Sequence, residues 1–238
     1  MPGFFLRGTH LERPPSVAPG IPEWPTRGTY MVNRFLQTLA GHLDRGTELA
    51  RRLRAIAVYI RTGIRFAGVG RHAKVRGAAY MTVGAKVGIG DFCWIEAVAS
   101  YAGRRYRPRL IIGDRVVLSD LTHISCVEAI QIGDDCLLGS KIYIGDHHHG
   151  SVSDIEEVMN VAPARRPLAD ISAVIVGDKT WICDGAVILP GTRIGCCSIV
   201  GANSVVQLQE DRPALIAGVP AKVIRYLDGE DGIGNSAS

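Results

Sequence analysis

Residues 176–205 read VGDKTW ICDGAV ILPGTR IGCCSI VGANSV, and each group of six residues begins with an aliphatic side chain. An amphipathic helix would place apolar residues three and four positions apart, so a strict period of six argues against a helix. Six residues fit a short strand followed by a tight turn, and three such units close one triangular coil. Each aliphatic leader then points into the coil and stacks on the leader of the next coil, at the strand spacing. The stretch therefore predicts a parallel β-helix.

The same period occurs twice more before this stretch. Residues 112–149 hold six hexads with one two-residue slip after Ala129, and residues 83–100 hold a weaker run of three. A β-sandwich would show period-two alternation and irregular turn spacing instead. With the hexad that begins at Val206, the chain has fifteen hexads, which predict about five coils. The glycine after many leaders is expected to allow turn dihedrals and close backbone approach. The predicted leaders are Val83, Ile89, Ile95, Ile112, Leu118, Ile124, Ile132, Leu138, Ile144, Val176, Ile182, Ile188, Ile194, Val200 and Val206.

The overall composition suits a protein inside the cell. The formal net charge is +4, and none of the six cysteines stands in a CxxC pair, so reduced thiols are expected. No run reaches the roughly 18 apolar residues that span a bilayer, and arginine and proline interrupt the N-terminal stretch MPGFFLRGTHLERPP. Neither a membrane span nor an ordinary signal peptide is therefore expected. The expected location is the cytoplasm or the inner face of the membrane.

The sequence divides into four parts. From Tyr30 to Thr62 apolar residues recur at three- and four-residue steps, and the second half of this segment is rich in arginine. Such a helix can cover the open end of the solenoid or rest on an anionic membrane, and the sequence leaves both roles open. The predicted parts are an irregular proline-rich arm (1–28), a helical cap (29–65), a β-helix domain (66–226) with inserted loops at 101–110 and 147–173, and a flexible tail (227–238).

Two interruptions of the repeat are the expected places for chemistry, because a solenoid face is otherwise uniform. The first, YAGRRYRPRL (101–110), holds four arginines that can contact an anionic acceptor or face solvent. It lacks the aromatic interleaving of a nucleic-acid platform, so no nucleic acid is expected as a partner. The second begins with three consecutive histidines after Asp146.

These histidines can bind a metal, transfer a proton or stay solvated. Neighbouring residues of an extended segment point to opposite faces, which argues against joint chelation of one ion by His147 and His148. Proton transfer by one of them is favoured, since imidazole changes its charge near neutral pH.

Three motifs carry a resemblance to a known family: YIGDHHHG (143–150), GDKTWICD (177–184) and the ending that runs from GANSVV to AGVPAKVIR (201–225). Over residues 69–226 the chain resembles the hexapeptide-repeat acyltransferases, including the maltose, galactoside and polysaccharide O-acetyltransferases. The resemblance implies an all-β fold, a left-handed parallel β-helix with an N-terminal helical cap. The handedness comes from the resemblance alone, because crossovers between parallel strands are ordinarily right-handed.

The resemblance also implies a reaction and its partners. Acetyl-CoA would be the acyl donor, no metal would be required, and the acceptor would be a sugar or a lipid-linked sugar in surface-polysaccharide synthesis. His147 matches the family's general base and would deprotonate the acceptor hydroxyl, which attacks the thioester directly. Relatives of this kind are homotrimers with active sites between subunits, and the same is expected here.

Further residues are assigned on the same resemblance. The expected acceptor contacts are Ser119, Asp146, His149 and Trp181, although Asp146 can equally orient its neighbour or cap the turn. The expected acetyl-CoA contacts are Asp184, Gly201, Ala202, Lys222 and Arg225. Glycine allows close backbone approach, and basic side chains meet phosphates. Asp184 departs from the serine or alanine of several relatives, so it either accepts a hydrogen bond from the pantetheine arm or leaves the oxyanion to other donors.

Three other functions remain open at this level. An amino-sugar or amino-acid acetyltransferase would use the same base. A γ-type carbonic anhydrase would need a metal held by three histidines on the same kind of prism. A non-catalytic scaffold would leave the long loop and the AGVPAKVIR ending unexplained.

Overall fold

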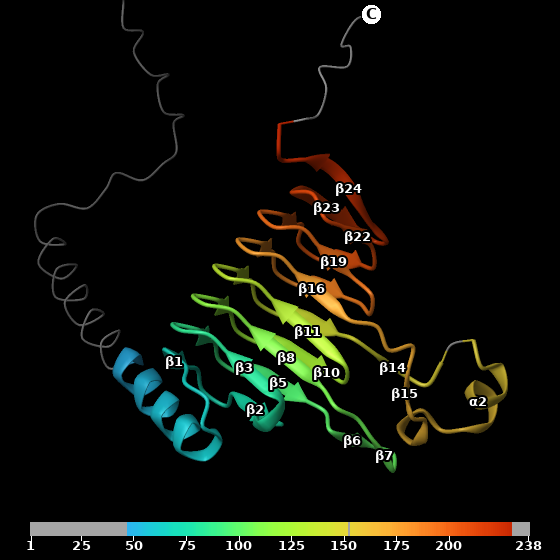
Figure 1. Cartoon of the computed structure of the whole chain (residues 1–238), viewed down its shortest axis with the longest axis horizontal. Coiled ribbons are helices and arrows are strands. Elements are labelled where there is room, and N and C mark those ends of the chain that lie inside the picture. Colours follow the sequence, from blue (N-terminus) through green and yellow to red (C-terminus); the bar gives the residue numbers. More distant parts are fainter. Residues whose placement is uncertain (1–46, 152, 230–238) are drawn as a thin grey trace, which may run out of the picture. The chain divides into compact units, whose positions relative to one another are not determined.

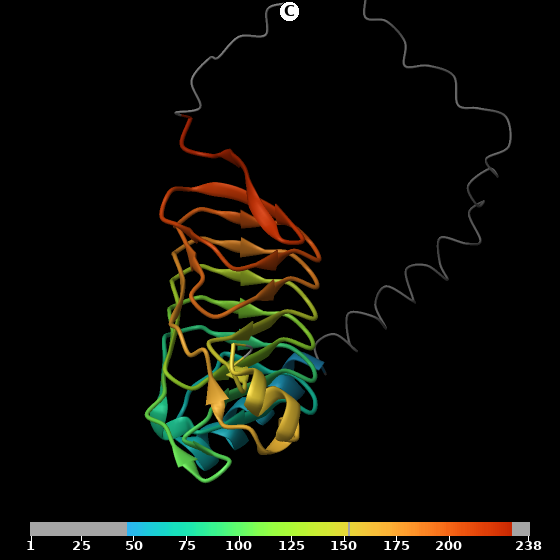
Figure 2. The ribbon, with the colours of Figure 1, turned by 90° about the vertical axis from the view of Figure 1, so that its right-hand side faces the viewer.

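In the computed structural model, which describes residues 47–151 and 153–229, the chain winds into stacked three-sided coils (Figure 1 and Figure 2). Successive short strands join three long sheets in rotation, and the strands of each sheet are parallel except at the C-terminal end of sheet 1. Sheet 1 contains β1 (Gly68–Val69), β4 (Gly88–Ile89), β9 (Val117–Leu118), β12 (Leu137–Leu138), β17 (Trp181–Ile182), β20 (Ile199–Val200), β23 (Ala214–Gly218) and the antiparallel β24 (Ala221–Tyr226).

The other two sheets have the same construction. Sheet 2 contains β2 (Lys74–Arg76), β5 (Trp94–Ala97), β10 (His123–Cys126), β13 (Tyr143–Gly145), β18 (Val187–Ile188) and β21 (Val205–Val206). Sheet 3 contains β3 (Met81–Val83), β8 (Arg109–Ile112), β11 (Ala129–Ile132), β16 (Val174–Val176), β19 (Arg193–Ile194) and β22 (Gln209–Glu210). The prediction of a parallel β-helix is confirmed.

Along the described residues the chain makes six complete circuits of the three sheets, where the sequence predicted about five. The sequence missed two of the three leaders of the first circuit, Val69 and Val75, which stack on Ile89 and Ile95. The short 3-10 helix η1 (Ala78–Tyr80) follows and moves the next leader two positions along the chain. That displacement hid the first coil from the period of six.

The predicted leaders form the core. Leu118, Leu138 and Ile182 occupy matching positions on neighbouring strands of sheet 1, and each is at most 1% exposed. Fourteen of the fifteen predicted leaders are buried, and Val83 in the first coil is half-buried. Burying one such side chain contributes about 1.5–3 kcal/mol relative to leaving it in water. The stack of leaders is therefore the main source of stability.

The glycines that follow the leaders are required by close approach and not by their dihedral angles. A Cβ on Gly90 would collide with the backbone of Ser119 and Asp120 in the next coil. The left-handed conformation lies two residues later, at Phe92 with φ 58°. The expected close approach is confirmed, whereas the expected turn dihedral was placed on the wrong residue.

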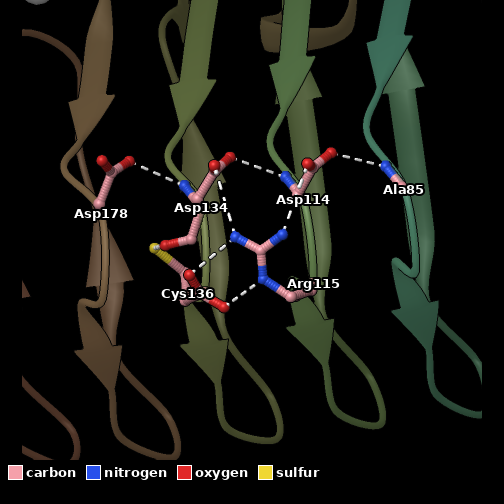
Figure 3. A network of polar contacts seen from close by, with 7 residues as sticks. Ala85, Asp114, Arg115, Asp134, Cys136 and Asp178 are labelled. Atoms are coloured by element: carbon pink, nitrogen blue, oxygen red, sulfur yellow. Dashed lines mark hydrogen bonds and ion pairs between the residues drawn. The ribbon is translucent and has the colours of Figure 1, made fainter.

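Carboxylates tie neighbouring coils together at the corner between sheets 3 and 1 (Figure 3). Asp178 accepts the backbone N–H of Asp134 at 2.8 Å, Asp134 accepts that of Asp114 at 2.8 Å, and Asp114 accepts that of Ala85 at 2.7 Å. Arg115 lies across this ladder, 3.5 Å from a carboxylate oxygen of Asp114 and 3.6 Å from one of Asp134. The aspartates of these hexads therefore bridge successive coils.

The helical residues 47–62 cover the first coil. Ala55 and Val58 are buried against it, and the Arg54 Nε donates to the Val69 carbonyl oxygen at 2.8 Å. Within the described ranges, no helix is long and apolar enough to cross a bilayer. The predicted arm (1–28), the first part of the predicted cap and most of the predicted tail lie outside the described residues.

Both predicted insertions leave the prism on the same side (Figure 1). The first contains the hairpin of β6 (Ser100–Tyr101) and β7 (Arg104–Arg105), and the second contains β14 (His148–His149), α2 (Ile155–Asn160), η2 (Pro163–Arg165) and β15 (Leu168–Ala169). The Tyr101 hydroxyl donates to the Ala164 carbonyl oxygen at 3.1 Å, and the Leu168 N–H donates to the Tyr106 hydroxyl oxygen at 3.1 Å. The two insertions therefore pack against each other.

Candidate active site

A pocket of about 300 Å³ lies between the two insertions and the outer face of sheet 2. The first insertion contributes Ser100 and Tyr101, and the second contributes His147, His149 and Leu168. The sheet contributes Arg76, Trp94, Glu96, His123 and Ser125, and Val98 follows β5. The two breaks in the repeat thus meet at one concave site.

Two stacked rings on sheet 2, Trp94 and His123, line the floor of the pocket and belong to a longer column of side chains. Side chains alternate across a strand, so the residue before each buried leader faces outward. In register, this rule stacks Lys74, Trp94, His123 and Tyr143 on four successive coils. The Trp94 and His123 rings stack at 4.7 Å between centroids, and His123 meets Tyr143 edge to face at 5.4 Å. Aromatic surface of this kind can pack against the apolar face of a sugar ring.

Polar groups line a second column beside the rings. Arg76, Glu96 and Ser125 occupy matching positions, each directly after a buried leader. The Trp94 Nε1–H donates to a Glu96 carboxylate oxygen at 2.7 Å, and the Arg76 guanidinium lies 5.5 Å from the Trp94 ring centroid. Hydrogen-bonding groups therefore surround the aromatic floor.

His147 lines the pocket two residues after the end of β13, with 6% of its surface exposed. Its Nδ1 lies 2.9 Å from Oδ1 of Asp146, which is fully buried. The Asp146 carboxylate also accepts the backbone N–H groups of Val127, Glu128 and Ala129 at 2.8 to 3.0 Å. A carboxylate surrounded by these donors acts as an acceptor, so the Nδ1 of His147 carries the proton. The Nε2 of His147 then holds the free lone pair that a general base needs.

The two other pocket histidines favour the neutral form. Burial lowers the pKa of His123, and the nearby His147 lowers it further while Glu96 opposes both effects. Burial also lowers the pKa of His149, again with a contribution from His147. The His147 and His149 rings are 6.3 Å apart, and Tyr101 meets the His149 ring edge to face at 5.1 Å. The lowered pKa values of His123 and His149 therefore favour uncharged imidazoles near neutral pH.

The buried cysteines are unsuited to nucleophilic catalysis. All six are free. Burial raises the pKa of the Cys126 thiol to about 12 and that of the Cys136 thiol to about 11. Burial and the neighbouring Asp184 also raise the pKa of Cys183. Thiols with raised pKa values stay protonated at neutral pH. Among the described residues, no three His, Cys, Asp or Glu side chains converge as a metal-binding group.

The structure unites only some of the expected site residues. His147 and His149 line the pocket, and Asp146 lies buried directly behind His147. Asp146 was expected to contact the acceptor, but all of its surface is covered and its oxygens are occupied. Of the alternatives left open, orienting His147 and tying down the turn at 127–129 both agree with its contacts.

The other expected residues lie elsewhere on the prism. Ser119, Asp184, Gly201 and Ala202 follow strands of sheet 1, at its corner with sheet 2. Asp184 accepts the Ser140 backbone N–H at 2.6 Å, so one of its oxygens bridges two coils as the corner aspartates do.

Trp181 and Arg225 share one column on the outer face of sheet 1. Trp181 is 47% exposed and pairs with Ile199, which pairs with Leu215, which pairs with Arg225. Lys222 is exposed on the same terminal strand, β24. None of these residues lines the pocket that holds His147.

Comparison with known proteins agrees with this architecture. No protein-family model matches the chain. WbbJ of Escherichia coli, named a putative lipopolysaccharide biosynthesis O-acetyl transferase, is 42% identical over 123 residues, which make up 51% of this chain and 62% of WbbJ. The match therefore spans less than two thirds of that protein. Galactoside O-acetyltransferase of Escherichia coli is 23% identical over 212 residues, covering 89% of this chain and 83% of the relative.

A solved structure shares the fold. AntD, an N-acyltransferase from Bacillus cereus in complex with dTDP and 3-hydroxybutyryl-CoA, has a TM-score of 0.53 at 19% identity, over 67% of this chain and 79% of AntD. The chain is a homologue of the proteins named WbbJ and galactoside O-acetyltransferase. The left-handed β-helix expected from the resemblance is confirmed.

Most of the residues that line the pocket on sheet 2 were not predicted from the sequence of this chain. Trp94, Glu96, Arg76, Ser125 and His123 were not selected as site residues. The signal was available, because each of these residues flanks a leader on a strand of sheet 2. Aligning the hexads coil above coil, instead of one after another, would have placed Trp94 beside His123.

Proposed function

We propose that the protein transfers an acetyl group from acetyl-CoA to a hydroxyl group of a sugar in surface-polysaccharide synthesis, with His147 as the general base. The observation that carries this proposal is the His147–Asp146 pair at 2.9 Å, at the edge of a pocket with an aromatic floor. A buried carboxylate that fixes the imidazole tautomer is the arrangement that general-base catalysis needs. The relatives WbbJ and galactoside O-acetyltransferase carry names of the same reaction class.

The proposed reaction uses one imidazole twice. The Nε2 of His147 accepts the proton of the sugar hydroxyl as the sugar oxygen attacks the thioester carbonyl carbon. The tetrahedral intermediate collapses with cleavage of the carbon–sulfur bond, and the imidazolium returns its proton to the departing sulfur. The products are an acetyl ester and the free thiol of CoA. No covalent acyl-enzyme is needed, which agrees with the raised pKa values of the buried cysteines.

The proposed donor site lies along the corner between sheets 1 and 2 in the last coils. Asp184, Gly201 and Ala202 follow successive strands there, and Lys222 and Arg225 lie on β24. His147 follows β13 of sheet 2, at the corner between sheets 2 and 3, on the other side of that sheet from the proposed donor site. A pantetheine arm lying on the corner between sheets 1 and 2 of one chain would reach the His147 of another copy more easily than the His147 of its own chain. We therefore include a homotrimer with sites between subunits in the proposal.

The proposed setting is the cytoplasm, at the inner face of the membrane where lipid-linked sugars are built. WbbJ is named for lipopolysaccharide biosynthesis, and a 26% identical relative, WcaF, is named for colanic acid biosynthesis. Both names support an acceptor that belongs to a surface glycan.

One observation favours a second candidate, transfer to an amino group. The Glu96 carboxylate lines the acceptor pocket and could hold an ammonium substituent of an amino sugar. His147 would serve as base in the same way. The two candidates differ in their product, since hydroxylamine cleaves an ester and leaves an amide intact.

The test is a screen for thiol release from acetyl-CoA against sugars, amino sugars and nucleotide-linked sugars. A hydroxylamine-sensitive acetylated sugar supports the proposal, and a hydroxylamine-resistant product supports the amino acceptor. Carbon dioxide hydration by protein with stoichiometric zinc in elemental analysis would instead establish the metal hydratase. Absence of thiol release with every acceptor class would reject acetyl transfer.

A further inference from the structure

The helical residues 47–62 carry a stripe of large aliphatic side chains that nothing in the described structure covers. Leu49, Leu53, Ile56 and Ile60 are 60%, 57%, 55% and 79% exposed. Their spacing of four, three and four residues keeps them on one face at 3.6 residues per turn. A helix on the surface of a soluble protein ordinarily turns such a stripe toward the core. Here the stripe faces away from it.

The orientation of this helix is fixed by its opposite face. Ala55 and Val58 are buried against the first coil. Two arginines of that face end on backbone carbonyl groups of the β-helix: Arg54 reaches Val69 at 2.8 Å, and Arg51 reaches Ile89 at 3.2 Å. Turning the stripe inward would break these contacts. The exposed stripe is therefore a property of the docked helix.

Positive charge surrounds the stripe. From Leu49 to Gly90 the sequence has nine basic residues and no acidic residue, and the flanking Glu48 and Asp91 form ion pairs with two of the nine, Arg52 and Arg71. The basic residues are Arg51, Arg52, Arg54, Arg61, Arg65, Arg71, Lys74, Arg76 and Lys86. An excess of this size at one end of a prism favours an anionic surface as partner.

Basic hollows flank the helix on both sides. A pocket of about 330 Å³ is lined by Arg52, Tyr59 and Arg65 together with apolar groups. Another, of about 180 Å³, is lined by Arg54, Arg61 and His72. An aliphatic ridge between two basic hollows matches the acyl chains and phosphate groups of a lipid leaflet.

We propose that the stripe formed by Leu49, Leu53, Ile56 and Ile60 docks on an anionic lipid bilayer, with the flanking arginines against the headgroup phosphates. The acceptor pocket begins close to this end, because Arg76 and Trp94 belong to the first two coils. Docking would thus bring the pocket toward acceptors carried on lipids. This last step rests on the proposed function, whereas the docking itself does not.

The experiment is flotation of the full-length protein with vesicles of phosphatidylcholine alone or with about one third phosphatidylglycerol. Anionic vesicles should bind at least about tenfold more protein, and added salt should weaken the binding. Leu53→Gln combined with Ile60→Gln should reduce binding about tenfold or more, and Arg61→Gln combined with Arg65→Gln should reduce its salt dependence. The matched control is Ile155→Gln, an exposed isoleucine on α2 that is 65% exposed and should leave binding unchanged.

The outcomes separate docking from catalysis. Equal flotation of the stripe variant and the wild type would overturn the proposal, as would equal binding to neutral and anionic vesicles. If the wild type does not float and the stripe variant has a different oligomeric mass, the stripe makes contacts between copies of the chain. That result would also overturn the proposal of lipid docking. Thermal melting checks that the variants fold. Transfer to a soluble acceptor should be unchanged in the stripe variant, so failure of the proposed function and failure of docking are distinguishable.

Discussion

Asp146→Asn tests the hydrogen-bond network behind the proposed base with almost no change of shape. In the wild type, Oδ2 of Asp146 accepts the N–H groups of Glu128 at 2.8 Å and Ala129 at 2.9 Å, and Oδ1 faces the Nδ1 of His147 at 2.9 Å. Asparagine keeps one acceptor oxygen, and the three backbone donors Val127, Glu128 and Ala129, all within 3.0 Å of Oδ2, will claim it. Its NH₂ group then faces His147. The Nδ1 must become an acceptor, so the proton moves to Nε2 and the lone pair that serves as base is lost.

The magnitude follows from these contacts. Loss of the correct tautomer should lower kcat by about 10²–10⁴-fold, the range that general-base catalysis contributes. Asp146→Asn should lower the free energy of unfolding by only about 2–3 kcal/mol, because charge-assisted hydrogen bonds become neutral ones and most donors keep a partner. Asp146→Ala would instead remove the acceptor of the Val127, Glu128 and Ala129 N–H groups, and the buried N–H of Val127 alone would cost about 1–3 kcal/mol. The asparagine variant therefore separates chemistry from folding.

The assay combines the rate of CoA thiol release with ¹⁵N NMR of the His147 ring. The variant should show the proton on Nε2 and a strongly reduced kcat, with a KM for acetyl-CoA close to that of the wild type. Asp134→Asn is the matched control, since Asp134 bridges two coils through a backbone N–H far from the pocket. An Asp146→Asn enzyme with near-normal kcat, or with the proton still on Nδ1, would refute the role assigned to Asp146.

Three other predictions concern the donor site, pH and the core. Lys222→Ala and Arg225→Ala should each raise the KM for acetyl-CoA by about 3–30-fold, with Lys86→Ala as an unaffected control, and unchanged values for both would remove β24 from the donor site. Because burial lowers the pKa of folded His123, the unfolded chain binds more protons below about pH 6.5, and stability should rise with pH up to that value. His123→Asn should flatten this rise in urea titrations at several pH values, and an unaltered slope would contradict the assignment. Ile124→Ala, at a fully buried position between two other leaders, should cost about 2–5 kcal/mol in calorimetry, and a cost below about 1 kcal/mol would argue against a close-packed stack of leaders.

The sequence predicted the fold well because one force dominates it. Each leader must be apolar because it is buried inside the prism, so a period of six in the apolar residues directly predicts the length of each side of a coil. The matching register of Leu118, Leu138 and Ile182 on neighbouring strands illustrates this. The prediction failed where the spacing between leaders departs from six residues. The η1 turn (Ala78–Tyr80) displaced one leader and concealed the first coil. The left-handed residues, such as Phe92, were also missed, because their conformation is imposed by the corner and leaves no mark in residue type.

The site was predicted less completely because it depends on contacts between distant coils. His147 and His149 stood out as breaks in a regular pattern, and both line the pocket. The packing of the two insertions depends on single bonds such as that from Tyr101 to Ala164, which no local pattern encodes. The burial of Asp146 beneath residues 127–129 likewise arises from the fold. Ser119 and Trp181 were matched by motif alone, and the coil geometry separates both from the pocket of their own chain.

The most direct test of the central claim is the rate of acetyl-CoA thiol release, with the acceptor found in the screen, for His147→Ala beside His148→Ala. The account predicts a rate about 10²–10⁴-fold lower for His147→Ala, with acetyl-CoA affinity within about twofold of the wild type by calorimetry, and a near-normal rate for His148→Ala. A His147→Ala enzyme that transfers acetyl at close to the wild-type rate would contradict the account.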